Sequence, residues 1–411
     1  MHLSIKNYFM RFNFLKQAVL ISGLSAVLSA TAVAQDNTYI GQDINTITTA
    51  VPFLLIAPDA RAGGMGEVGV SSDPDANSLH WNPAKYTYID GDMGFSLSYS
   101  PWLRALVSDI NLAYLTGYKK LANDQVISGS LLYFSLGDIT FTDIQGETIG
   151  NFRPNEFALT GGYSRKLTDN LSGAITARYI HSNLTQGQEV SGSATKPGNT
   201  YAADIAVYSR HDLEFKNMEG YFAWGLNISN IGAKISYSTN TERDFIPTNL
   251  RIGPSLTLDV DDYNRLSFMV DINKLLIPTP PVYYLDSVDG NGDGVIKFGM
   301  NPDVSVPAGM LQSFYDAPGG FKEEMHEIAI AVGVEYWYDK QFAIRGGYFN
   351  EHSTKGNRKF FTLGAGLRYN VFGLDFAYLI PTGGQANNPL ENTLRFTLHF
   401  DFDAFQKQSA K

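Results

Sequence analysis

The sequence predicts an all-β protein, a transmembrane antiparallel β-barrel of about fourteen strands with an N-terminal hatch or plug in its lumen. Three observations lead to this fold class. Apolar and polar residues alternate in many segments of roughly 8 to 12 residues, and the connections between these segments alternate between short and long. After residue 35, no apolar run approaches the about 18 residues that a membrane helix needs.

The first 34 residues predict a signal peptide. Their only charges are basic: Lys6, Arg11 and Lys16. An apolar stretch at 18–33 follows and ends in small residues, so we expect cleavage before Gln35. A membrane anchor is the alternative, but the apolar stretch is short and contains Ser and Gly. Loss of the three basic residues would change the formal charge from −10 to −13.

Residues 35–92 predict compact irregular chain that acts as a hatch. The glycines at 63, 64 and 66 permit positive φ angles and close backbone packing, while Asp-Pro and Asn-Pro sequences favour turns. Just before the first strand, such a segment can fold back into a barrel. The predicted hatch residues are Gly63, Gly64, Gly66, Asn82, Pro83 and Ala84. A phosphate-binding loop is disfavoured, because no strand precedes the glycines and no Lys-Ser/Thr follows them.

Residues 394–402 show the strand pattern most clearly. Leu and Phe occupy one face, and the other face carries Arg395, Thr397, His399 and Asp401. Lipid outside and water inside require this alternation. A soluble β-sandwich strand would give the same pattern, so the number of such segments and their connections decide between the two folds.

About fourteen strands are expected between residues 93 and 402, an even number as in bacterial barrels. They begin near Gly94, Asp109, Val126, Glu156, Leu171, Tyr201, Tyr221, Asn249, Asn264, Glu327, Gln341, Lys359, Val371 and Asn392. Aromatic residues near strand ends, Trp337 among them, are expected at the membrane interface.

The connections are expected to differ at the two ends of the barrel. Tight turns follow five even-numbered strands, at 119–125, 166–170, 261–264, 339–341 and 369–370. Longer loops follow odd-numbered strands, at 140–154, 182–200, 232–248 and 274–326. This sorting is typical of outer-membrane barrels, with the long loops extracellular and the turns periplasmic. It places the tail at 403–411 in the periplasm. The connection at 209–220 is longer than a periplasmic turn should be.

Composition excludes several functions. The chain has no Cys, which removes thiol catalysis, Cys-ligated zinc and iron–sulfur clusters. A pI of about 5.2 argues against nucleic-acid binding. The pair His399 and Asp401 could imitate an outer-membrane hydrolase site, but charge networks are common in barrel lumens. We therefore expect no catalytic and no cofactor-binding residues.

The longest loop contains one candidate metal site. Asp289, Asn291 and Asp293 alternate ahead of Gly294, as in the first half of an EF-hand calcium loop. The twelfth position is Met300 rather than Glu, so a further carboxylate would have to come from Asp286 or Asp303. The spacing is compatible with a calcium site, and a flexible Asp/Gly-rich turn is the competing interpretation.

The hatch region resembles a known family. Asn82-Pro83-Ala84, preceded by an Asp/Ala/Asn-rich turn, resembles the N-terminal hatch of the FadL family of fourteen-stranded outer-membrane transporters. The longer string at 58–70, followed by 73–85, is similar to the PorV branch of that family. PorV proteins are outer-membrane shuttle components of type IX secretion systems.

The resemblance implies a non-enzymatic role in the outer membrane. Such a protein binds the C-terminal β-domain of cargo at the large translocon barrel and delivers the cargo to a cell-surface sortase or attachment complex. Its other contacts would be outer-membrane lipid and lipopolysaccharide, with no nucleic acid and no required cofactor. A FadL-type channel for hydrophobic small molecules is the alternative, and an outer-membrane enzyme is a third class. The hatch string and the loop 274–326 favour the shuttle.

Overall fold

The computed structural model describes residues 44–402, with gaps at 105–106, 108, 123, 143–144, 189–193, 216–217, 239–242, 289–293 and 383–387. The predicted signal peptide, residues 35–43 of the predicted hatch and the tail therefore lie outside the described residues. So do the predicted calcium ligands Asp289, Asn291 and Asp293.

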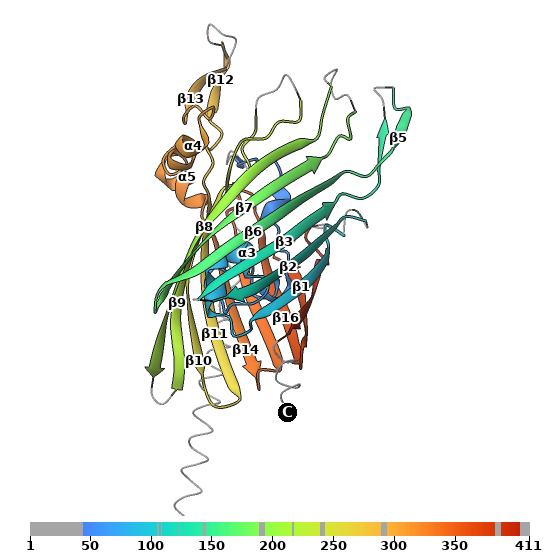
Figure 1. Cartoon of the computed structure of the whole chain (residues 1–411). Helices are drawn as coiled ribbons and strands as arrows, with labels where there is room; N and C mark the ends of the chain where they lie inside the picture. The colour runs from blue at the N-terminus through green and yellow to red at the C-terminus, as the bar shows by residue number, and fades with distance from the viewer. Residues whose placement is uncertain are drawn as a thin grey trace, which may run out of the picture. The chain divides into compact units, whose positions relative to one another are not determined.

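Within the described residues, fourteen antiparallel strands form a closed barrel (Figure 1). They are β1 Met93–Pro101, β2 Asn111–Leu121, β3 Gln125–Ser135, β6 Asn155–Thr168, β7 Leu171–Asn183, β8 Gly198–Phe215, β9 Met218–Gly232, β10 Asn249–Asp259, β11 Asn264–Leu275, β14 Ala329–Tyr338, β15 Phe342–Asn350, β16 Lys359–Tyr369, β17 Phe372–Pro381 and β18 Leu394–Asp401. Each pairs with its neighbour in sequence, and β1 closes on β18 through pairs such as Leu97↔Leu398. The predicted fold class is confirmed.

The side chains of β18 show how the wall is built. Arg395, Thr397 and His399 are buried in the interior, whereas Phe396 and Leu398 are exposed on the outside. An apolar exterior around a polar interior is stable when lipid surrounds the wall. No helix among the described residues is both long and apolar enough to span a membrane.

The connections are short at one end of the barrel and long at the other. At the turn end, neighbouring strands are joined by two to four residues; at the loop end, the connections contain eight to fifty-three residues. β1 begins and β18 ends at the turn end.

Two details differ from the sequence predictions. The connection predicted at 209–220 is only two residues long, because β8 and β9 pair as far as Phe215↔Met218. Backbone pairing continues there although the apolar pattern has stopped. Trp337, predicted at the membrane interface, lies instead beside the guanidinium groups of Arg345 and Arg368, on the same face of β14 as the buried Glu335.

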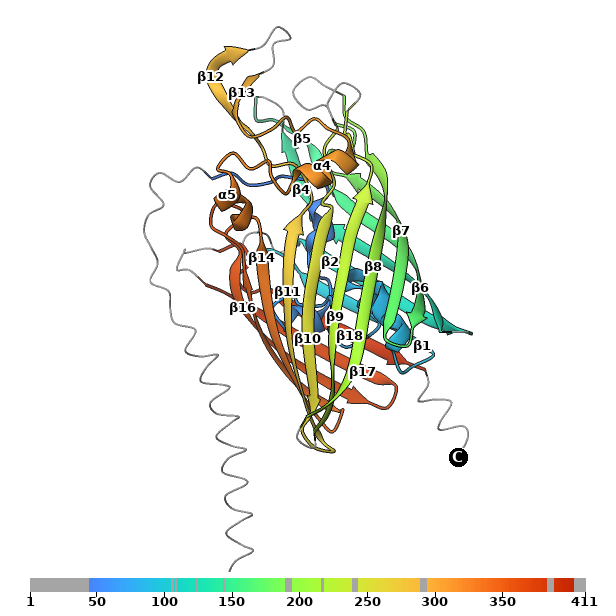
Figure 2. The ribbon, with the colours of Figure 1, turned by 90° about the vertical axis from the view of Figure 1, so that its left-hand side faces the viewer.

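Additional elements lie at the loop end. β4 (Ile139–Thr142) and β5 (Thr148–Phe152) form a hairpin between β3 and β6. Between β11 and β14 the chain forms an arm, residues 276–328 (Figure 2). The arm contains β12 (Val282–Val288), β13 (Gly294–Phe298), α4 (Val306–Gln312) and α5 (Phe321–His326).

The inner segment, residues 51–92, lies within the barrel and is largely buried. It consists of short helices: η1 (Pro52–Leu55), α2 (Ala60–Gly63), α3 (Ser78–Trp81) and η2 (Pro83–Tyr88). Phe53 and Leu54 pack on Leu112, Leu132 and other inward-facing side chains of the wall. The lumen is therefore a packed core that the inner segment and the inward-facing side chains of the wall form together.

Candidate functional site

Asn82, Pro83 and Ala84 join the inner segment to three neighbouring strands. The Asn82 side-chain amide donates to the backbone O of Val207 on β8 at 3.0 Å. The backbone oxygens of Pro83 and Ala84 accept hydrogen bonds from Ser164 on β6 and Ser172 on β7, at 2.7 and 2.8 Å. Asn82 also caps η2, because its Oδ1 accepts from the Ala84 amide at 3.0 Å. The predicted Asn-Pro-Ala motif thus lies at a buried junction with the wall.

Gly63, Gly64 and Gly66 lie where the inner segment touches the other side of the barrel. A Cβ atom added to Gly63 would lie 2.7 Å from the Arg395 side chain, and one added to Gly64 would lie 2.9 Å from the Cα of Gly364. Gly66 has a φ of 71°, and its amide donates to Thr362 Oγ1 at 2.7 Å. These positions require glycine for close approach and, at Gly66, for its backbone conformation.

Buried charges also tie the inner segment to the wall. Arg61 donates to both oxygens of Glu335 on β14, at 2.7 and 3.0 Å, and to Asp75 at 3.0 Å. Arg395 on β18 pairs with Glu67 at 2.7 Å. Because these groups are almost excluded from solvent, each depends on its partner to offset the loss of hydration.

A ladder of charges continues along the inner wall. Arg345 pairs with Glu335 at 2.6 Å and with Asp375 at 2.9 Å, and Asp375 also binds Arg368. His399 Nε2 lies 2.6 Å from Asp375 Oδ2, so the histidine belongs to this ladder. This structural role accounts for the position of His399, for which sequence reasoning had considered a hydrolase pair with Asp401. The ladder itself was not predicted.

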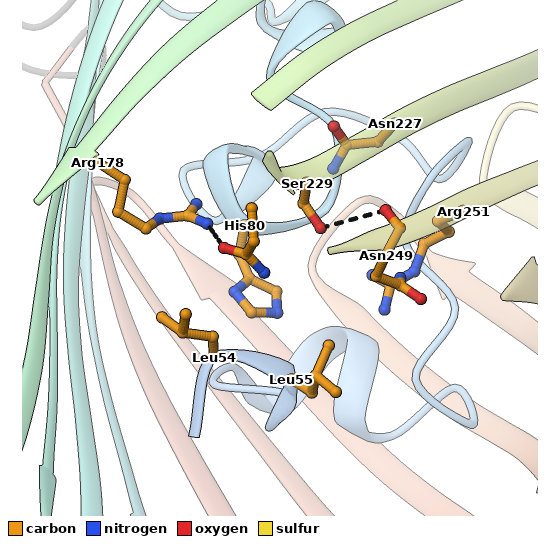
Figure 3. A pocket seen from close by; sticks show the side chains of 9 residues that line it. Leu54, Leu55, His80, Arg178, Asn227, Ser229, Asn249 and Arg251 are labelled. Carbon is orange, nitrogen blue, oxygen red and sulfur yellow. Dashed lines mark hydrogen bonds between the residues drawn. The ribbon is translucent and has the colours of Figure 1, made fainter. Parts of the chain in front are cut away.

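Small polar cavities remain between η1, α3 and the wall (Figure 3). The first has an empty volume of about 340 Å³, part of it open to solvent. It is lined by Leu54, Leu55, His80, Arg178, Asn227, Ser229, Asn230, Asn249 and Arg251. A second cavity has more apolar lining, but Arg178 and His80 line it too. Charged and amide groups thus dominate the space that the inner segment leaves.

The arm is attached to the barrel mouth through α5. Lys274, at the end of β11, contacts Glu324 and Glu327 at 3.1 and 2.7 Å. Lys355, in the connection between β15 and β16, contacts Glu323 and Glu327 at 2.6 and 3.0 Å. These interactions hold α5 over the adjacent strands.

Two histidine rings reinforce this attachment. His326 of α5 stacks on His352, with ring centroids 3.5 Å apart and planes inclined by 9°. Among the described residues, no group of three or more His, Asp or Glu is arranged to hold a metal ion. Asp303, a candidate carboxylate for the predicted calcium site, instead contacts Lys234 at 3.2 Å.

The arm exposes large apolar side chains at the barrel mouth. On α4, on α5 and in the link between them, these are Leu311, Phe314, Tyr315, Phe321 and Met325, with Phe321 80% exposed. Exposed apolar clusters of this kind mark interaction surfaces. Sequence reasoning missed these residues; their only signal was a concentration of Phe, Tyr, Leu and Met in a segment without strand periodicity.

The apolar outer wall, the polar interior and the closed sheet define the class: an outer-membrane β-barrel protein with an occupied lumen. The family model of the type IX secretion system protein PorV matches residues 39–282, which is more than half of the chain. The chain therefore belongs to the PorV family and to the type IX secretion system.

Comparison with solved structures gives more distant similarities. The Pseudomonas putida toluene transporter TodX is 10% identical, with 87% of this chain and 98% of that chain covered and a TM-score of 0.44. The Ralstonia pickettii toluene transporter TbuX is 12% identical (84% and 98%, TM-score 0.42), and a Pseudomonas aeruginosa FadL homologue is 10% identical (87% and 99%, TM-score 0.40). No curated protein matches the sequence. The family assignment therefore stands on the family model.

Proposed function

We propose that this PorV-family barrel is a non-enzymatic shuttle that receives secreted cargo at the translocon and passes it to the attachment machinery on the cell surface. Its partners would be the large translocon barrel, the C-terminal β-domains of cargo proteins and the sortase complex. The long loops face the cell exterior in this proposal, and the inner segment keeps the lumen closed. Cargo is then handled on the mouth of the barrel rather than through it.

The exposed apolar surface of the arm is the observation that supports this proposal most. Phe314, Tyr315 and Phe321 are large, exposed and adjacent to a rigid attachment on the barrel. Aromatic side chains on a fixed support are common anchors in protein–protein interfaces. A soluble domain that docks on the arm would bury these three side chains, whereas the apolar residues of the barrel wall are already covered by lipid.

A channel for hydrophobic small molecules is less well supported. Its path would run through the lumen, where the inner segment forms many contacts with the wall and Arg178 and His80 line both described cavities. Sites for apolar ligands are lined mainly by apolar side chains. The lumen therefore offers a hydrophobic solute little favourable contact.

Substitution of the arm aromatics tests the docking proposal. The triple variant Phe314→Ser, Tyr315→Ser and Phe321→Ser should insert normally, because none of these residues belongs to a barrel strand. Cargo secretion in cells that carry only this variant should fall at least tenfold. The matched control is Tyr263→Ser, which alters an exposed aromatic at the turn end. Normal secretion by the triple variant, with hydrophobic-solute uptake lost when Asn82→Ala loosens the inner segment, would favour the channel.

We also propose that Asp289, Asn291 and Asp293 bind calcium in the β12–β13 connection. Three oxygen ligands at alternate positions and an extracellular setting with millimolar calcium support this site. Calcium should then slow proteolysis within 286–296, and Asp293→Ala should remove the effect. Equal cleavage rates with calcium and with a chelator would contradict the calcium site and leave a flexible Asp/Gly-rich turn as the interpretation of this sequence.

A further inference from the structure

The described chain starts at the loop end of the barrel, opposite to the end at which β1 begins. Residues 44–50, here called the strap, lie at the loop end, where Figure 2 shows the start of the described chain beside α5. β1 begins at Met93 at the turn end. The inner segment between them therefore runs the full length of the lumen, from the mouth to the turns.

The strap is bonded to three separate parts of the mouth. The Asn45 amide N–H donates to the backbone O of Thr354, in the connection between β15 and β16, at 3.2 Å. The Asn45 side chain donates to the backbone O of Pro280 at 3.1 Å and to Glu323 Oε1 at 3.0 Å, both in the arm. The Ala50 amide donates to the backbone O of Phe245, between β9 and β10, at 3.0 Å.

The chain turns sharply into the lumen directly after the strap. Val51 is 1% exposed and has a φ of 47°, a left-handed conformation that a β-branched residue rarely adopts. The burial of Val51, Phe53 and Leu54 against the wall offsets the energetic cost of this backbone conformation. The entry point of the chain is thus fixed by packing, not left to a free terminus.

We propose that the strap clamps the arm against the barrel mouth. Asn45 is the clamping residue because it donates hydrogen bonds both to the arm and to the β15–β16 connection. This inference does not depend on what docks on the arm.

Proteolysis of the purified barrel tests the clamp. Asn45→Ala should raise the rate of cleavage within the arm several-fold, while cleavage at the turn end stays unchanged. Thr48→Ala is the matched control, because Thr48 is exposed in the same strap and its hydroxyl bonds to none of the described residues. Equal arm cleavage in wild type, Asn45→Ala and Thr48→Ala would overturn the clamp, provided that heat-modifiable gel mobility shows all three to be folded.

Discussion

At the scale of single residues, two adjacent glycines on β15 have different surroundings. Gly347 is in close contact with the inner segment, whereas Gly346 has open space beside it. A Cβ atom added to Gly347 would lie 2.1 Å from the backbone carbonyl carbon of Met65, in the inner segment. One added to Gly346 would have only Thr362 O within 4 Å, at 3.9 Å. Only the first glycine is required by the fold.

Gly347→Ala should therefore displace the inner segment, whereas Gly346→Ala should be tolerated. Backbone cannot move aside as a flexible side chain can, so we expect Gly347→Ala to lower the free energy of unfolding by about 3 kcal/mol or more. Gly346→Ala should leave it unchanged within about 0.5 kcal/mol. Denaturant unfolding of the two variants in lipid vesicles measures the difference. Similar stabilities would mean that the inner segment does not press on β15 as described.

Arg61 provides the second prediction at this scale. Arg61→Met removes the partner of Asp75 and one of the two arginines that contact Glu335, leaving buried negative charge without full compensation. The loss of stability should be about 3 to 5 kcal/mol. Adding Glu335→Gln should recover part of this loss, because the uncompensated charge is then removed. Additive losses in the double variant would show that the two side chains do not interact.

At the scale of elements, the attachment of α5 includes the His326–His352 stack. Burial is the main cause that lowers the pKa of both imidazoles, and nearby positive charge adds to it. The charged groups that face the pair are Lys322, Glu323, Lys355 and Lys359. Glu323 acts in the opposite direction on His326 but does not cancel the lowering of its pKa.

The arm should therefore loosen in acid. Because both folded-state pKa values lie below the usual 6.5, the stack contributes fully above pH 6.5 and is lost as the pH falls through the lowered values. Amide hydrogen exchange in α5, corrected for the intrinsic rate, should be faster at pH 5.0 than at pH 7.5. His352→Gln should reduce this pH dependence, and His211→Gln at the turn end should not. An unchanged profile in His352→Gln would exclude the stack as its source.

The elements also show what a sequence can and cannot predict here. Period-two alternation predicted the inward face of β18, because each side chain of a strand faces either lipid or lumen. It could not predict that Arg61 meets Glu335, since that contact depends on the path of the inner segment across the lumen. The arm has no periodicity, and its attachment through Lys274, Glu324 and Glu327 depends on groups about 50 residues apart. Local patterns predict the wall, whereas long-range contacts determine the mouth.

At the scale of the whole molecule, the barrel combines an occupied lumen with a mouth that exposes large apolar side chains. Hydrogen bonds from Asn82 and ion pairs from Arg61 hold the inner segment, and the strap and α5 fix the arm beside it. A lumen so filled leaves the mouth as the surface available for partners. The hatch string at 58–85 was the part of the sequence that pointed to the family, because its turn chemistry reflects close contacts with the wall.

In the proposed type IX secretion shuttle, the arm is the docking surface. The most direct measurement is quantitative identification of the proteins that co-purify with the tagged barrel after detergent extraction from its own outer membrane, compared between wild type and the Phe314/Tyr315/Phe321→Ser variant. A large translocon barrel and cargo β-domains should accompany the wild-type protein and should be reduced at least tenfold with the variant. Equal recovery of these partners with both proteins, or their absence from the wild-type sample, would contradict it.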